Sequence, residues 1–357
     1  MDHEFSLILI MRRYELKYLL AYPVAFLPLL GLYLRGPWVF LTPVIVYILL
    51  PFVELFFNGS KENMDKLDEA ERKVRPVFDW LLYLNLPILY LTLGVFLWTI
   101  AFIPLELYEI IGLTVSVGTS CGTLGINVGH ELGHRKSRFE RLLAQALLLG
   151  SLYQHFYIQH NRGHHRWVTT PRDSATARKG EWLYTFWFRS MSGGFIEAWQ
   201  LEYHRLDGKW FSWKNLMLRF FLLEITVVAT IGLLLGWQAM LAFMAAAFVG
   251  GTLLETVNYL EHYGLQRKEI RPGVYEPVSP KHSWNSNHEL GRIMLYELTR
   301  HSDHHFKATR KYQVLRHIDE SPQLPYGYPG SIVLALCPPI WFKLMDREVE
   351  KWRNIHG

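Results

Sequence analysis

The chain has 357 residues, half of them apolar and 15% aromatic, with a formal net charge of +5 and two cysteines. This length is ample for a sizeable core. The hydrophobicity is gathered in long runs, which is typical of a membrane protein. Cys121 and Cys337 form no C-x-x-C pair, so disulfide frameworks, zinc ribbons and four-cysteine iron sites are disfavoured. No internal repeat or linker interrupts the sequence, and we expect one domain over residues 1–357.

Six apolar runs with at most two charged residues each are long enough to span a hydrocarbon core about 30 Å thick, which takes about 20 helical residues. They cover residues 18–34, 38–57, 80–103, 108–129, 216–237 and 239–260. Because no water in a bilayer can satisfy free backbone groups, these runs must be helices. The sequence predicts an all-α integral membrane protein, with six transmembrane helices and a histidine-rich cytoplasmic cap.

The orientation follows from the short loops. Lysine and arginine gather before the first span, between the second and third, and after the fourth, whereas the loops at 35–37 and 104–107 are poor in them. Positive charge favours the cytoplasmic side of a membrane. Both termini and the segments 58–79, 130–214 and 262–357 are therefore expected in the cytoplasm.

Histidine is frequent and unevenly placed. The chain has 16 histidines, yet none between His3 and His130. Nine then lie at the expected cytoplasmic ends of apolar runs: His130 and His134 in "HELGH", His160, His164 and His165 in "HNRGHH", His262 in "NYLEHYG", and His301, His304 and His305 in "RHSDHH". Residues three or four apart share one helix face, so the imidazoles of each cluster would converge. This pattern predicts a metal site.

The remaining histidines are interpreted as solvated or hydrogen-bonded side chains outside the site. They are His3, His155, His204, His282, His288, His317 and His356.

The string "HELGH" is also the pattern of a zinc protease helix. An intramembrane protease would take its aspartate ligand from "LDG", here Asp207, but Asp207 lies outside every predicted span. A single zinc would also leave most of the nine histidines without a role. Nine imidazoles suffice for two metals with four or five nitrogen ligands each, and ligand type alone leaves iron, copper and zinc open. A redox metal at the mouth of an apolar bundle suits oxidation of a substrate dissolved in lipid.

The strings H-x3-H, H-x3-HH and H-x2-HH resemble the histidine boxes of the membrane di-iron oxygenases and desaturases. Within that group, "NYLEHYGL", "SWNSNH", "RHSDHH", "TRKYQVLRH" and "PQLPYGY" resemble the bacterial alkane 1-monooxygenases, or alkane ω-hydroxylases. The likeness runs in order from the spans before His130 to about residue 345.

The resemblance implies a di-iron centre, in which the nine histidines hold two iron ions. It implies hydroxylation of the terminal methyl group of medium-chain n-alkanes to primary alcohols with O2, in a bacterial inner membrane. It also implies electrons from rubredoxin, which an NADH-dependent reductase serves. Some members carry a fused rubredoxin domain; none is seen in these residues, so the donor is expected to come from outside residues 1–357.

Four polar residues are expected to support the ligands through the second ring nitrogen of a histidine. Glu131, Glu261 and Asp303 each adjoin a predicted ligand, and Asn258 lies one helical turn before His262. Asn127 and Glu255 are further polar residues within or near spans, where such groups are costly and usually paired.

A hydrophobic slot between the spans is expected to hold the substrate. Val46, Tyr47 and Leu50, which precede the bend expected at Pro51, are one candidate wall. Ordinary helix packing explains these three residues equally well.

Basic residues flank the predicted ligands and could dock an acidic electron donor. They are Arg135, Lys136, Arg138, Arg162, Arg166, Lys307, Arg310, Lys311 and Arg316. Contact with lipid headgroups explains the same charges.

Other functions stay open at this point. A fatty-acyl desaturase, a lipid hydroxylase or a xylene-type methyl hydroxylase would use similar boxes. A haem electron carrier or a metal transporter is disfavoured, because the histidines cluster on one side and the midplanes of the spans are nearly free of charge.

Overall fold

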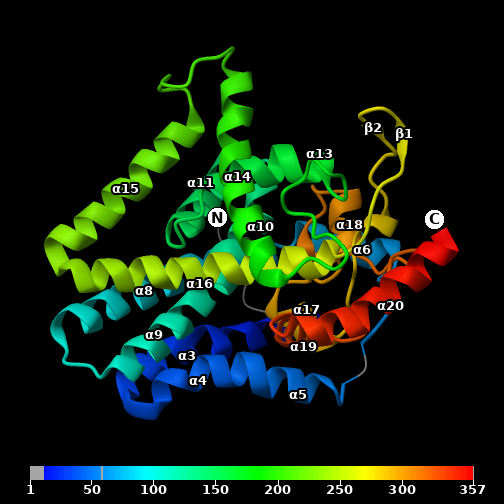
Figure 1. Ribbon diagram of the computed structural model, residues 1–357. Helices are drawn as coiled ribbons and strands as arrows, with labels where there is room; N and C mark the ends of the chain where they lie inside the picture. Colours follow the sequence, from blue (N-terminus) through cyan, green and yellow to red (C-terminus); the bar gives the residue numbers. More distant parts are fainter. Residues whose placement is uncertain (1–11, 58, 357) are drawn as a thin grey trace, which may run out of the picture.

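The computed structural model describes residues 12–57 and 59–356, which are almost entirely helical (Figure 1). The first half contains α2 (Arg13–Leu16), η1 (Lys17–Leu20), α3 (Ala21–Leu34), η2 (Gly36–Phe40), α4 (Leu41–Val44), η3 (Ile45–Leu49), α5 (Leu50–Glu54), α6 (Lys66–Val74), α7 (Pro76–Tyr83), α8 (Asn85–Phe102), α9 (Leu107–Ser120), η4 (Cys121–Asn127) and α10 (Val128–Gly133). Of the seven histidines predicted to lie outside the site, His3 falls outside the described residues.

The second half contains α11 (Arg138–Leu149), α12 (His155–Gln159), η5 (His160–His164), α13 (His165–Trp167), α14 (Leu183–Arg205), α15 (Leu216–Leu235), α16 (Trp237–His262), η6 (Pro280–His282), α17 (Glu289–Met294), α18 (His301–Phe306), η7 (Tyr312–Val314), α19 (Tyr328–Ala335) and α20 (Pro338–His356). The strands β1 (Glu269–Arg271) and β2 (Val274–Tyr275) form a short antiparallel hairpin.

Within residues 12–57 and 59–356, six helical runs are long and apolar enough to cross a membrane, which confirms the predicted multi-pass, all-α fold. They are Tyr14–Leu34, Gly36–Glu54, Pro76–Phe102, Leu107–Gly133, Leu216–Leu235 and Trp237–His262. The predicted boundaries lie within four residues of these limits. The fourth and sixth runs continue past their predicted ends at 129 and 260. His130 and His262 therefore lie on the same continuous helices as these spans, just beyond the predicted apolar stretches.

The helix α16 passes through the middle of the bundle (Figure 1) and packs closely on α9 and η4. Small residues make this approach possible. A Cβ atom added at Gly250 would lie 2.6 Å from the Cβ of Cys121, and one at Gly118 would lie 2.5 Å from the Cβ of Val249. Membrane helices associate through such close packing, because lipid tails are as apolar as the side chains themselves.

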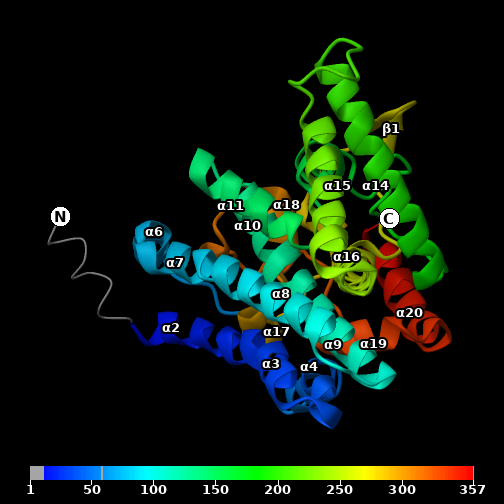
Figure 2. The same ribbon diagram turned by 90° about the vertical axis from the view of Figure 1, so that its left-hand side faces the viewer.

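The helices α14 and α15 form a hairpin that projects from one side of the bundle (Figures 1 and 2). α15 is peripheral: only 6% of its apolar stretch is buried inside the protein, whereas 61% of the corresponding stretch of α16 is buried. α14 lies in the segment 130–214, where the sequence predicted no span, and packs against α12 and α16. It therefore supports the segment that carries three of the predicted ligands.

Two π-helical turns adjoin the histidines. η4 precedes His130, and η5 contains His160 and His164. A π turn inserts an extra residue per turn and changes the direction of the side chains that follow it; such turns are frequent at functional sites.

A buried ion cluster fixes the turn before α18. Tyr296 and Glu297 adopt positive φ angles of 50° and 58°. The carboxylate of Glu297 pairs with Arg292 at 2.6 Å and with Lys17 at 3.0 Å. Burial by itself raises the pKa of Glu297, but Arg292 and Lys17 outweigh it and lower that pKa to about 2. The network therefore ties the first span to the last histidine cluster.

We expect Gly250→Ala to lower the melting temperature of the purified protein, because the new methyl group would also lie 3.0 Å from the backbone nitrogen of Gly122. Overpacking of this kind costs roughly 1–3 kcal/mol. The matched control is Gly94→Ala in α8, where a Cβ atom meets nothing within 4 Å. Equal melting temperatures for the two variants would contradict this account of the η4–α16 contact.

Candidate metal centre

Four distant parts of the chain bring the nine predicted histidines together at one end of the bundle. His130 lies in α10 and His134 directly follows it. The α12–α13 run contributes three histidines, α16 contributes His262 as its last residue, and α18 contributes three more. These nine form two groups, within each of which the ligand atoms all lie within 4.8 Å of one another.

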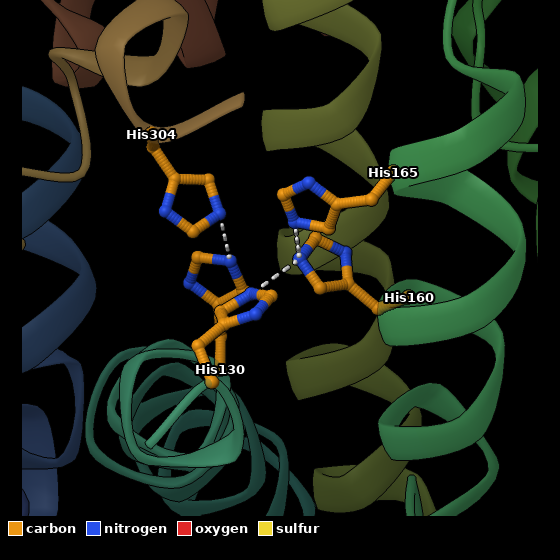
Figure 3. A group of neighbouring side chains, drawn as sticks. His130, His160, His165 and His304 are labelled. Carbon is orange, nitrogen blue, oxygen red and sulfur yellow. Dashed lines mark hydrogen bonds between the residues drawn. The ribbon is translucent and has the colours of Figure 1, made fainter. Parts of the chain in front are cut away.

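The first group contains His130, His134, His160, His165 and His304. Its ring nitrogens face one another, as four of the five members show in Figure 3. The Nε2 atoms of His130 and His304 are 3.0 Å apart, and Nε2 of His160 lies 3.1 Å from that of His134 and 3.0 Å from that of His165. Five nitrogen donors therefore surround one small volume.

The second group contains His164, His262, His301 and His305, and all four are buried. Nε2 of His164 lies 3.2 Å from Nε2 of His305. The adjacent residues His164 and His165 thus serve different groups, as their separation of about 100° around a helix permits.

The rings are held in the form that binds metals. Burial, and then repulsion from neighbouring imidazoles, lowers the pKa of six of them well below the ordinary histidine value; these are His134, His160, His165, His301, His304 and His305. A neutral imidazole keeps a lone pair for a metal ion.

One of these nitrogens also lacks a hydrogen-bond partner. Nε2 of His262 is buried without one, while its Nδ1 lies 3.2 Å from the His282 carbonyl oxygen. Buried polar atoms are seldom left unpaired in proteins. A metal ion in the second group would provide the partner for Nε2 of His262, and both groups have the composition and the spacing of metal sites.

Carboxylates and a carbonyl group orient part of the second group. Oδ2 of Asp173 lies 2.9 Å from Nδ1 of His164, and the carbonyl oxygen of His282 lies 3.2 Å from Nδ1 of His262. Burial raises the pKa of Asp173, but the His164 imidazole and the Thr176 hydroxyl outweigh it and lower that pKa. Asp173 keeps the charge that fixes the His164 ring.

Asp173 was missed by the sequence analysis. It lies in an irregular stretch after α13, nine residues beyond His164, where no helical spacing relates the two. Only the folded loop brings them together, so no sequence signal could have found this pair.

The four predicted supporting residues have different surroundings. A Glu261 oxygen lies 3.1 Å from Nε2 of His301, and Glu261 also accepts a hydrogen bond from the Tyr328 hydroxyl at 3.0 Å. The amide of Asn258 donates to Glu255 and touches no ligand ring directly.

Glu131 and Asp303 face away from the rings and pair with arginines. Glu131 lies 2.8 Å from Arg135 and accepts the Tyr312 backbone N–H. Asp303 pairs with Arg316 at 3.0 Å and accepts its backbone N–H. These two carboxylates brace the segments that carry the ligands, from outside the site.

None of the six described histidines predicted to lie outside the site belongs to either group. These are His155, His204, His282, His288, His317 and His356. Asp207, the ligand that a protease would need, lies in the turn after α14 and also belongs to neither group.

An apolar slot leads towards the histidines from within the bundle. Its walls come from α3, the second span, η4, α16, α17 and α19, and they include Val46, Tyr47 and Leu50. A smaller cavity beyond it is lined by His130, His160, His301, Glu261 and Asn258. The two spaces share the lining residues Asn127, Leu254, Val257 and Leu298. The slot therefore ends where both histidine groups face a common space.

A second hollow reaches the site from the polar side. It is lined by His134, by the acidic residues Glu69 and Glu140, and by basic residues from three segments, namely Lys73, Arg135, Lys136, Lys307, Arg310 and Lys311. Arg138, Arg162, Arg166 and Arg316 do not line it, and Arg162 and Arg316 pair instead with Glu202 and Asp303. His134 is thus the member of the first group that lines this hollow.

Comparison with known proteins gives this geometry a family. A family model described as "Fatty acid desaturase" matches residues 107–333, which include all nine histidines. Alkane 1-monooxygenase 1 of Pseudomonas aeruginosa is 39% identical to the chain, over 88% of this chain and 84% of the relative. Alkane 1-monooxygenase 1 of Alcanivorax borkumensis is also 39% identical, over 92% of this chain and 83% of the relative.

The chain belongs to the alkane 1-monooxygenase family. A more distant relative is XylM of Pseudomonas putida, the hydroxylase component of a xylene/toluene monooxygenase, with 29% identity over 93% of this chain and 88% of its own. Family membership supports an O2-dependent monooxygenase in a membrane, and it favours iron over zinc or copper as the metal of the histidine groups.

We expect Asp173→Asn to weaken metal binding, because the amide that replaces the carboxylate has no negative charge with which to hold the His164 imidazole. Loss of such a partner costs roughly 10–100-fold in metal affinity. The metal content of purified protein after dialysis against a chelator measures the effect. Asp207→Asn, in an exposed turn, is the matched control; equal retention of metal by the two variants would contradict the role given to Asp173.

Proposed function

We propose that this protein is a di-iron alkane 1-monooxygenase. It would hydroxylate the terminal methyl group of medium-chain n-alkanes to primary alcohols, with O2 and with electrons from rubredoxin. The observation that carries the proposal is the apolar slot that ends between two groups of histidines. The relatives named alkane 1-monooxygenases support the substrate class.

The nine histidines are the proposed ligands of two iron ions, one in each group. Five nitrogens in the first group and four in the second match the coordination that nitrogen-rich iron sites use. Iron supplies the redox chemistry that activates O2 and breaks a strong C–H bond. Glu261, Asp173 and the carbonyl of His282 are the proposed supports of these ligands.

The chain's own part is positioning and exclusion of water. An alkane carries no polar group, so it can be selected only by shape and by apolar contact. Leu254, Val257 and Leu298 would guide the chain end towards the histidines. One oxygen atom enters the terminal C–H bond to give the alcohol, and the other leaves as water after uptake of two electrons and two protons.

The proposed location is a bacterial inner membrane, with the histidine end and both termini on the cytoplasmic side and with residues 1–357 as one hydroxylase domain. The distribution of basic residues supports this orientation. A rubredoxin reduced by an NADH-dependent reductase would then meet the basic hollow at His134, which connects the polar surface to one of the proposed ligands.

We expect the double variant Lys136→Glu/Lys307→Glu to slow reduction by rubredoxin, because both exposed lysines line the hollow and rubredoxins are acidic. At low salt the second-order rate constant should fall roughly tenfold and become less sensitive to ionic strength. Lys268→Glu, an exposed residue away from this hollow, is the control. Reduction by a small neutral reductant should be unchanged, and a wild-type rate with rubredoxin would reject this docking site.

We expect Val46→Trp to shorten the preferred alkane, because Val46 lines the slot. The ratio of dodecane to octane turnover should fall roughly tenfold. Ile48→Trp is the matched control, since Ile48 lies two residues away and is 65% exposed on the outer face of the span. The same product ratios in both variants would show that the slot does not hold the alkane.

The direct test is metal analysis of the purified protein, followed by octane turnover with rubredoxin, its reductase and NADH. We expect about two irons per chain and 1-octanol as the product. A single zinc without O2 uptake would overturn the proposal and would return the zinc protease hypothesis to consideration.

The similarity to XylM supports a second candidate, a methyl hydroxylase for alkylaromatic substrates. Competition between octane and p-xylene separates the two, since the preferred substrate is the one with the higher kcat/KM. Alkene instead of alcohol as the product would indicate a desaturase.

A further inference from the structure

Buried carboxylates near the two histidine groups fall into two classes. Glu131 and Asp303 pair with arginines, as described above. Asp173, Glu255 and Glu261 are buried at 3%, 4% and 1% exposure and form no ion pair with any lysine or arginine among the described residues. Asp173 and Glu261 touch ligand rings. Glu255 touches none, so its burial needs another explanation.

Glu255 lies in α16 and is held by three neutral groups. The Tyr153 hydroxyl donates to one oxygen at 2.6 Å, and the Ser190 hydroxyl and the Asn258 amide donate to the other. These three donors satisfy both oxygens of the carboxylate, which therefore needs no proton of its own to complete its hydrogen bonds.

The position of Glu255 relates it to the centre. Its partner Asn258 lines the cavity onto which His130, His160 and His301 face. Asn258 therefore connects the Glu255 carboxylate to the wall of a cavity that members of both histidine groups line.

An isolated charge in such surroundings costs several kcal/mol unless an opposite charge compensates it. Two divalent ions held by neutral imidazoles have the opposite problem, because nine histidines bring no negative charge. We infer that Glu255 is a counter-charge for the metal pair, fixed by Tyr153, Ser190 and Asn258 at a distance from the ligands. This inference rests on the proposed function.

A fixed negative charge stabilises the more positive, oxidised state of a centre more than its reduced state, since the Coulomb energy grows with the charge of the centre. Glu255 therefore lowers the reduction potential of the centre. It also strengthens metal binding, because it offsets positive charge that the ligands leave uncompensated.

The test is Glu255→Gln in the full-length, iron-loaded protein, with a redox titration followed by EPR or Mössbauer spectroscopy. We expect a more positive reduction potential, unchanged iron content as purified, and extraction of iron by a chelator on the order of tenfold faster. Glu255→Asp, which keeps the charge, should return the potential towards the wild-type value.

Two controls separate charge from packing. Glu224→Gln removes another carboxylate from the spans. Glu224 lies on α15, accepts the Gln154 backbone N–H and belongs to neither histidine group. The reduction potential of this variant should match that of the wild type. Tyr153→Phe removes a hydrogen bond but keeps the Glu255 charge, and should shift the potential less than Glu255→Gln does.

An unchanged potential in iron-loaded Glu255→Gln would overturn the counter-charge inference alone. An equal shift in Tyr153→Phe or Glu224→Gln would overturn it as well, since packing would then be the cause. Failure of the wild-type protein to bind two irons would instead reject the proposed function, so the two failures are distinguishable.

Discussion

The structure depends on holding nine imidazoles against one another in a buried space. Nitrogen lone pairs that face each other at about 3 Å repel, and buried nitrogens without partners are costly. No single segment could impose this arrangement, because each supplies at most three rings. The arrangement exists because four helix ends are fixed at the same level of the bundle. A metal ion bound between these nitrogens would remove the repulsion, because each lone pair would then coordinate the ion.

The fixing forces differ on the two sides of the site. On the polar side, carboxylates next to ligands are tied to cations: Glu131 to Arg135, and Asp303 to Arg316. On the inner side, α16 lies directly against η4 through Gly250, so the helix that ends in His262 has little freedom to slide. Ion pairs therefore hold the segments that meet water, and close packing holds the helix that passes through lipid.

The apolar slot and the basic hollow reach the histidine groups from different environments, one from within the bundle and one from the polar side. In the proposed function, a substrate without polar groups would come from the apolar side, where shape alone can select it, and electrons would come from the basic surface at His134. The histidine groups lie where the two routes meet. In such a position the polar residues that remain on the inner side, such as Asn258 and Glu255, act on the centre in a medium of low dielectric constant, where each charge has a long reach.

The sequence by itself determined the class of the protein and its ligands. Long apolar runs predicted the six spans, because a bilayer leaves the backbone no alternative to helix. The convergence expected within each histidine cluster holds for His130 and His134 but is wrong for the other two clusters, which divide between the two groups. The resemblance of the boxes named the family that the comparisons then showed.

Only the tertiary structure decided how the nine rings divide into five and four, because the partners of each ring come from other segments. It also decided that Asp173 orients His164 while Asp303, adjacent to a ligand in sequence, turns to Arg316. Helical periodicity relates side chains within one turn or two. It contains no information about which loops and helix ends pack against each other, and that packing chooses the neighbours of every ligand.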